Sequence, residues 1–228
     1  MMLIDAEKAY HGLAIRAHSQ TAGRGQRGRS WQAVPGQSLL FSLITTPPFA
    51  LPQQFLFAAL SATAVASTVR QLAPGVKVHI KWPNDIIIND KKAGGILIEN
   101  VIRGSQWAHA VIGLGLNVLQ PSLPPDLPHA TSLLITTGHQ FSVSQVAALI
   151  RQAVLQALAH PPLPEAIMTA YNQYLYKAAE PQSFSQDGQS FSATVQSVTH
   201  SGQLLLHLPG GTQAFTHGQL NWLWPSPY

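Results

Sequence analysis

The sequence predicts an α+β fold, in which a mixed, largely antiparallel sheet has helices on one side and is followed by a small C-terminal β-barrel. Strand-like segments follow one another directly between residues 76 and 118, without the intervening helices of a parallel βαβ chain. After Pro181 the composition changes to short alternating runs separated by glycine turns, which is typical of a small barrel. We therefore expect one domain at residues 1–180 and a second at residues 181–228.

The composition limits the class of protein. The 228 residues are 46% hydrophobic and only 10% charged, which favours a chain with a sizeable core over a disordered one. The absence of cysteine excludes disulfides, thiol catalysis and cysteine-ligated metals. Neither a signal-peptide pattern nor an apolar run long enough to span a bilayer is present, so we expect a cytoplasmic protein.

Apolar periodicity places the individual elements. A stripe of alanine and valine at helical spacing predicts a helix over residues 52–72. Two further helices are expected, over residues 143–157 and 165–176, after a proline-rich loop. Strands are expected at 12–20, 38–45, 76–81, 85–88, 94–102 and 107–118, and in the second part at 191–198, 203–208 and 213–215.

The first of three motifs is the string GRGQRGRSW at residues 23–31. Its glycines let the backbone approach a ligand closely, and its three arginines are planar donors suited to carboxylate and phosphate groups. The tryptophan offers a stacking surface. The pattern favours an anion-binding loop, but short glycine-arginine strings also occur in solvated basic turns and in nucleic-acid-binding arms.

The second motif is the string KWPND at residues 81–85, followed by KKAGGI at residues 91–96. Two strands joined by a tight turn would bring Lys81 and Lys92 to neighbouring positions, where an anion bound between them would relieve their repulsion. A hairpin with exposed lysines and ordinary turn chemistry explains the same residues equally well.

The third motif is the string IGLGLN at residues 112–117. Glycine at alternate strand positions clears one face for a ligand, and Asn117 at the strand end can pair with an amide or a base edge. A strand packed tightly against a helix is the alternative. The histidines show no metal-ligand spacing, and there is no GxSxG or P-loop string, so we expect no protein-held metal, serine hydrolase or P-loop NTPase.

Taken in this order, the motifs resemble those of the biotin protein ligase family, in its monofunctional type without an N-terminal DNA-binding domain. The family strings are GRGRxGRxW, KWPND, K-x-A/G-G-I and G-x-G-x-N, and they match residues 20–31, 81–85, 92–96 and 113–117 in order. The resemblance covers nearly the whole chain. It implies that residues 1–180 form a catalytic domain for biotin and ATP.

The implied activity is that of an AMP-forming ligase that makes an amide bond. Biotin and ATP would form biotinyl-5′-adenylate, and biotin would then pass to one lysine of the biotin carboxyl carrier protein of acetyl-CoA carboxylase. The implied cofactors are ATP and Mg²⁺, with the metal held through the phosphates. The ligase is expected to be a monomer or homodimer with no DNA or membrane partner.

The resemblance also implies roles for individual residues. Lys92 would bridge the biotin carboxylate and the α-phosphate with the help of Arg24, and Asp85 would hold the incoming carrier lysine. The biotin site would be lined by Gln20, Gly23, Arg24, Gly25, Gln26, Lys92, Gly95 and Ile96. The nucleotide side would be lined by Arg29, Trp31, Asn84 and Asn117.

Two departures from the family pattern and two alternative functions stay open. Gln26 stands where the family loop has arginine, which removes one cation. The family's Ser-Thr-Asn string has no counterpart here, and residues 1–11 are expected to form the tail of the helix that follows it. One alternative is a lipoate or octanoyl ligase, which has a related fold but lacks KWPND. The other is a basic nucleic-acid-binding module, which is disfavoured because no lysine or arginine follows Lys177.

Overall fold

The computed structural model describes residues 9–224, and its main feature is a six-stranded sheet with the order β1-β2-β6-β5-β4-β3. Every neighbouring pair in this sheet is antiparallel. Its strands are β1 (Ala14–Ala17), β2 (Ser38–Thr45), β3 (Val78–Lys81), β4 (Asp85–Ile88), β5 (Lys91–Arg103) and β6 (Gln106–Asn117).

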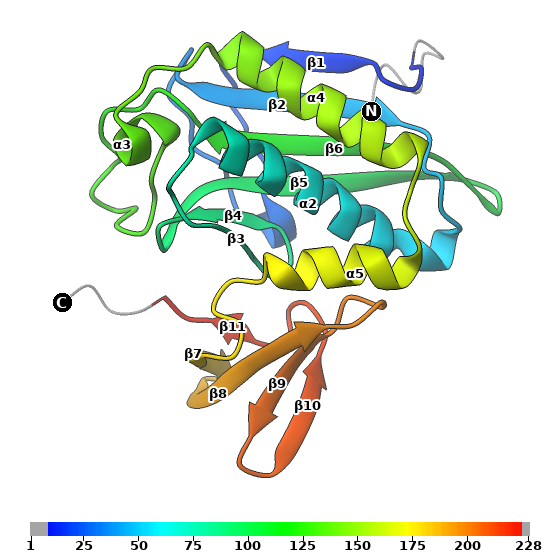
Figure 1. Ribbon diagram of the computed structural model, residues 1–228, viewed down its shortest axis with the longest axis vertical. Helices are drawn as coiled ribbons and strands as arrows, with labels where there is room; N and C mark the ends of the chain where they lie inside the picture. Colours follow the sequence, from blue (N-terminus) through cyan, green and yellow to red (C-terminus); the bar gives the residue numbers. More distant parts are fainter. Residues whose placement is uncertain (1–8, 225–228) are drawn as a thin grey trace.

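Three long helices cover one face of this sheet (Figure 1). They are α2 (Gln54–Leu72), α4 (Val143–Ala159) and α5 (Pro164–Gln173), and the short α3 (Leu133–Thr137) precedes α4. Contrary to the expectation from the sequence, the segment Leu51–Leu72, which includes α2, is long and apolar enough by length and composition to cross a membrane, but 61% of its apolar window is buried inside the protein. Small side chains such as Ala59, Ala62 and Ala66 are almost fully buried and allow α2 to pack closely on the strands.

Among residues 9–224, no long helix covers the opposite face of the sheet, and the site lies on this face. In β6, Ile112, Leu114 and Leu116 are at most 2% exposed and belong to the core beneath the helices. Because side chains alternate along a strand, Gly113 and Gly115 lie on the other face. The predicted α+β fold, with a largely antiparallel sheet and helices on one side, is therefore confirmed.

A second, five-stranded antiparallel sheet follows at the C-terminal end, with the order β10-β9-β8-β7-β11. Its strands are β7 (Pro181–Gln186), β8 (Gln189–Val198), β9 (Leu204–Leu208), β10 (Gly211–Phe215) and β11 (Asn221–Trp222). The predicted small C-terminal β unit is present, but it is an open sheet and not a closed barrel. Closure requires the edge strands to pair, and the two-residue β11 pairs only with β7 within the described range.

Two expectations from the sequence remain outside what the structure tests. The helix tail expected at residues 1–11 falls mainly outside the described residues, and residues 9–11 contain no helix. That residues 1–180 and 181–228 are separate domains stays a prediction.

The second sheet is held against the first by hydrogen bonds from the KWPND segment. Trp82 Nε1 donates to the Gly202 carbonyl at 3.0 Å, and Lys81 Nζ donates to the Trp222 carbonyl at 3.1 Å. The side chain of Asn172, in α5, bonds both the amide and the carbonyl of Val198. These contacts bring the C-terminal strands to the edge of the helix-free face.

Candidate active site

A cavity of about 930 Å³ opens on the helix-free face of the six-stranded sheet. Its size is within the range of small-molecule sites in proteins. Its walls are formed by the glycine-arginine loop, by residues of β1, β2, β5 and β6, by the KWPND segment, and by the C-terminal sheet with Ser185 and residues between His217 and Trp224. The three motifs of the sequence therefore meet at one place.

The glycines of β6 make a flat floor for this cavity. A Cβ atom at Gly115 would lie 2.5 Å from Cε2 of Trp31, so only glycine leaves room for the indole ring. A Cβ atom at Gly113 would lie 3.2 Å from the carbonyl oxygen of Leu97, which also lines the cavity. The alternate glycines thus clear one face, as the third motif predicts, and part of the space is taken by Trp31 of the loop.

The glycine-arginine loop folds over the cavity as a narrow hairpin. The Trp31 amide donates to the Gly23 carbonyl at 3.0 Å, and the Gly25 amide donates to the Arg29 carbonyl at 2.6 Å. The tip of the hairpin is the short 3-10 turn η1 (Gln26–Gly28), in which Arg27 has a φ of 55°. That left-handed conformation is uncommon for a residue with a side chain.

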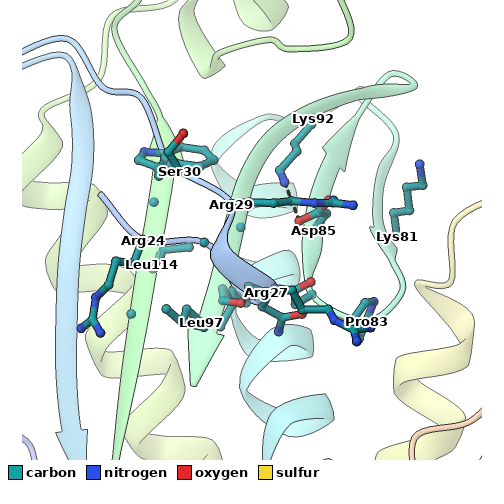
Figure 2. A pocket seen from close by; sticks show the side chains of 18 of the residues that line it. Arg24, Arg27, Arg29, Ser30, Lys81, Pro83, Asp85, Lys92, Leu97 and Leu114 are labelled. Carbon is teal, nitrogen blue, oxygen red and sulfur yellow. Dashed lines mark hydrogen bonds and ion pairs between the residues drawn. The ribbon is translucent and has the colours of Figure 1, made fainter. Parts of the chain in front are cut away.

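An ion pair of Arg24 connects this loop to the sheet. Its two terminal nitrogens lie 3.1 Å from the two carboxylate oxygens of Glu99, on β5. Figure 2 shows the Arg24 guanidinium directed away from Lys92 and Asp85. The expected pairing of Arg24 with Lys92 around an anion is therefore not formed in this state, and Arg29 is the loop arginine that extends toward Asp85 (Figure 2).

Lys92 and Asp85 form an ion pair inside the cavity, with Nζ 2.7 Å from Oδ1 (Figure 2). A Cβ atom at Gly95 would lie 3.4 Å from that carboxylate oxygen, an ordinary van der Waals distance, so the ion pair lies directly over the Gly95 backbone. The backbone of Lys92 is held on its other side, because its amide donates to the His129 carbonyl and its carbonyl accepts from the Thr131 amide. A fixed amine and a fixed carboxylate thus face the same space.

Lys81 also lines the cavity, although the family resemblance implies no role for it. Only 6% of Lys81 is exposed, and its Nζ lies 3.7 Å from the ring centre of Trp224. Burial lowers the pKa of Lys81 to about 8; Asp85 opposes this shift, and the charges of Lys92 and Arg29 add to it. The repulsion expected between Lys81 and Lys92 is offset by Asp85, the strand partner of Lys81.

Eleven of the residues that the family resemblance implicates line this one cavity, and two do not. Gly23 lies beside it, where a Cβ atom would overlap Gln20 Nε2. Asn117 is 6% exposed and is bonded within the protein, donating to the Thr131 carbonyl and accepting from Gln120 Nε2. The eleven that line the cavity are Gln20, Arg24, Gly25, Gln26, Arg29, Trp31, Asn84, Asp85, Lys92, Gly95 and Ile96.

The fold is that of the biotin protein ligases. The structure of biotin protein ligase from Aquifex aeolicus in complex with biotin and ATP matches it with a TM-score of 0.79, covering 95% of this chain and 91% of that one at 20% identity. The Leishmania major enzyme in complex with biotinyl-5-AMP matches with a TM-score of 0.62, covering 89% and 87% at 22% identity.

The sequence comparison defines the family. A model of the Biotin/lipoate A/B protein ligase family matches residues 3–117, and this chain belongs to that family. The bifunctional ligase/repressor BirA of Bacillus subtilis is 38% identical over 137 residues, which are 58% of this chain and 41% of that protein. The biotin--[acetyl-CoA-carboxylase] ligase of Paracoccus denitrificans is 28% identical over 215 residues, covering 87% and 85%. The chain therefore spans about two fifths of the bifunctional relatives.

The pKa of Lys81 gives the cavity a charge that depends on pH. The ammonium is present at pH 7 and is lost as the pH rises through about 8. We expect inorganic triphosphate to bind about three- to tenfold more weakly at pH 9 than at pH 7, measured by calorimetry. The Lys81→Met variant is the control, because the protonation of triphosphate itself changes with pH in the same way for both proteins. This variant should bind triphosphate weakly at both pH values. An equal pH dependence in the two proteins would contradict a contribution from Lys81.

Proposed function

We propose that this chain is an ATP-dependent biotin ligase, which forms biotinyl-5′-adenylate and transfers biotin to a lysine of a biotin carboxyl carrier protein. The observation that carries the proposal is the gathering of Arg29, Lys81 and Lys92 around Asp85 in one cavity with a flat glycine floor. Both substrates of the first step, a carboxylate and a triphosphate, are anions. A site for them needs several cations at close range.

In the first step the biotin carboxylate attacks the α-phosphate and pyrophosphate leaves. Lys92 is suited to hold the two reacting anions together, because its Nζ lies in the open cavity with a single ionic partner, Asp85, among the described residues. Arg29 and Lys81 would offset charge on the nucleotide side. Asn84 is proposed there as well, although its side-chain amide donates to the Ile96 carbonyl.

The loop has a purpose in this chemistry. An acyl-adenylate is a mixed anhydride that water hydrolyses, so it must be covered until the acceptor arrives. Residues 23–31 lie over the cavity, with Trp31 stacked on Gly115 as an apolar wall. We propose that Gln20, Gly25, Gln26, Gly95 and Ile96 enclose biotin beneath this cover.

In the second step a neutral lysine amine of the carrier attacks the acyl group, the bond between the acyl group and the phosphate breaks, and AMP leaves. Asp85 would orient that amine and accept its proton, since its carboxylate faces the cavity beside Lys92. No covalent enzyme intermediate is needed. The Paracoccus relative is named for acetyl-CoA carboxylase, which supports a carboxylase carrier as the partner, and we propose that the reaction takes place in the cytoplasm.

Mg²⁺ is proposed to enter on the phosphates of ATP. Within residues 9–224 no group of three or more histidine, aspartate or glutamate side chains is placed to hold a metal ion. Asp85 and Glu99, the carboxylates that line the cavity, are each paired with a cation. When bound, Mg²⁺ would supply charge neutralisation of the phosphates.

The direct test is mass spectrometry of a biotin carboxyl carrier domain incubated with the protein, ATP and biotin. We expect one lysine of the carrier to gain biotin only when ATP is present. Equimolar lipoate as competitor separates the two specificities that the family name covers. Transfer of lipoate in preference to biotin would contradict the proposal and would identify the protein as a lipoate ligase.

Lys92→Ala should nearly abolish pyrophosphate release in the presence of biotin and ATP, because the cation that brings the two anions together is lost. The fold should remain, since the side chain is partly exposed and its ion pair contributes little to stability. Lys91→Ala, at the exposed neighbouring position, is the control and should behave as the unmodified protein. Near-normal pyrophosphate release by Lys92→Ala would remove Lys92 from the mechanism.

Gln26→Arg should slow the escape of biotinyl-5′-adenylate. Gln26 lines the cavity, and its buried Oε1 has no hydrogen-bond partner in the described part of the chain. A charge-assisted bond from arginine to the phosphate would strengthen retention by about 1–2 kcal/mol, roughly five- to thirtyfold in the dissociation rate. The measurement is the loss of radiolabelled adenylate from the protein after rapid gel filtration. Gln26→Leu controls for size without charge, and an equal effect of both substitutions would refute the electrostatic explanation.

A further inference from the structure

The turn Thr216–Gln219 joins β10 to β11 and reaches the mouth of the cavity, where His217 and Gly218 line the wall opposite the sheet. The turn is closed by two hydrogen bonds. The Gln219 amide donates to the Thr216 carbonyl at 3.1 Å, and the Thr216 amide donates to Gln219 Oε1 at 2.7 Å. His217 packs edge-on against Trp82 with the ring centres 5.6 Å apart, which fixes the turn on the KWPND segment.

The tip of the glycine-arginine loop rests on this turn. Arg27 Nη1 donates to the His217 carbonyl at 3.1 Å. A Cβ atom built on Gly218 would lie 0.8 Å from that nitrogen and 1.9 Å from Cζ, so the guanidinium occupies the space that only a glycine leaves empty. Burial and the charges of Arg27 and Arg29 lower the pKa of His217, which keeps the imidazole neutral beside the arginines at pH 7.

The contact holds a backbone that positions the next functional arginine. Arg27 is in the left-handed region, and the Arg29 amide on the far side of the same turn donates to the Gln26 carbonyl. A conformation that is unfavourable for a side-chain-bearing residue persists only where its surroundings hold it. Fixing Arg27 therefore fixes the direction in which Arg29 leaves the loop.

We propose that the turn Thr216–Gln219 is an anchor for the glycine-arginine loop and that Arg27 is a positioning residue, which sets Arg29 toward the nucleotide side by docking on Gly218. The loop is then held at two points, by Glu99 through Arg24 and by the C-terminal sheet through Arg27. The effect on catalysis rests on the proposed ligase function. The anchoring itself does not depend on that function.

The test is hydrogen–deuterium exchange of residues 23–31 in the ligand-free protein. Gly218→Ala pushes the guanidinium out of its place, and Arg27→Ala removes it. Each variant should raise exchange in the loop about fivefold, the factor expected when one hydrogen bond that opposes local opening is lost. The double variant should show no further increase, because both changes break the same contact.

Gly188→Ala is the matched control. Gly188 has a φ of +82°, close to the +93° of Gly218, but a Cβ atom there would meet nothing within 4 Å. It therefore carries the same backbone cost in the same sheet without touching Arg27, and its loop exchange should stay at the original level. The proposal is overturned if Gly218→Ala and Arg27→Ala leave the loop unchanged, if their effects add, or if Gly188→Ala loosens the loop equally.

Kinetics separate positioning from general stability. In the ligase assay Gly218→Ala should raise the KM for ATP about fivefold and leave the KM for biotin nearly unchanged, whereas Gly188→Ala should alter neither. An equal change in both constants would show a general structural effect and would contradict the positioning role. If the unmodified protein proved to have no ligase activity, the exchange result would still decide the anchoring.

Discussion

At the centre of the six-stranded sheet β5 pairs with β6, and successive side chains of each strand point to opposite faces. Ile98 and Ile112 therefore pack in the core under the helices, while Gly95, Glu99 and Gly115 face the cavity. A shift of register by one residue would exchange these two sets and destroy both the core and the floor of the site. The site depends on this pairing because the hydrogen bonds between β5 and β6 support the core on one face of the sheet and the floor of the cavity on the other.

Three cations of the cavity, Arg24, Lys81 and Lys92, are held by other side chains of the protein before any ligand arrives. Glu99 forms an ion pair with Arg24, and Asp85 forms one with Lys92. The ammonium of Lys81 lies over the indole ring of Trp224. These side chains are fixed in position but remain positively charged, so they can still bind an anion. A bound anion would replace contacts that already exist, which limits the reorganisation that binding requires.

The local periodicity of the sequence predicts much of the fold, and long-range contacts account for what it misses. The buried strand at residues 38–45 and the helix that ends at Leu72 are found as predicted. The strand β7 was not predicted because Phe184 is its single buried residue among polar neighbours, and the two-residue β11 is too short to show a period. The short helix α3 was missed for the same reason, since five residues give barely one turn.

In the candidate site, too, local patterns predict some features and long-range contacts determine the others. The three motifs do converge on one cavity, because each motif carries its own turn or strand signal. Glu99, the partner of Arg24, lies 75 residues away in the sequence, and Trp222, which covers Lys81, lies 141 residues away. No local sequence pattern predicts either contact. Asn117 fits the family string, yet its side-chain amide donates to the carbonyl of Thr131, which lies 14 residues further along the chain, and its oxygen accepts from Gln120.

The burial of Lys81 in the site lowers the stability of the folded protein. Its pKa is about 8 in the folded protein against the ordinary 10.5, so between these values the unfolded chain binds more protons and stability rises with pH. Below pH 8 the lysine is charged in both states, and the full penalty of burying the ammonium remains, on the order of 3 kcal/mol. At pH 7 the protein therefore keeps a desolvated cation under Trp222 and Trp224 that its own carboxylates do not fully compensate. An anion bound in the cavity would reduce this penalty, and that is the physical reason to assign Lys81 to substrate binding and not to the stability of the sheet.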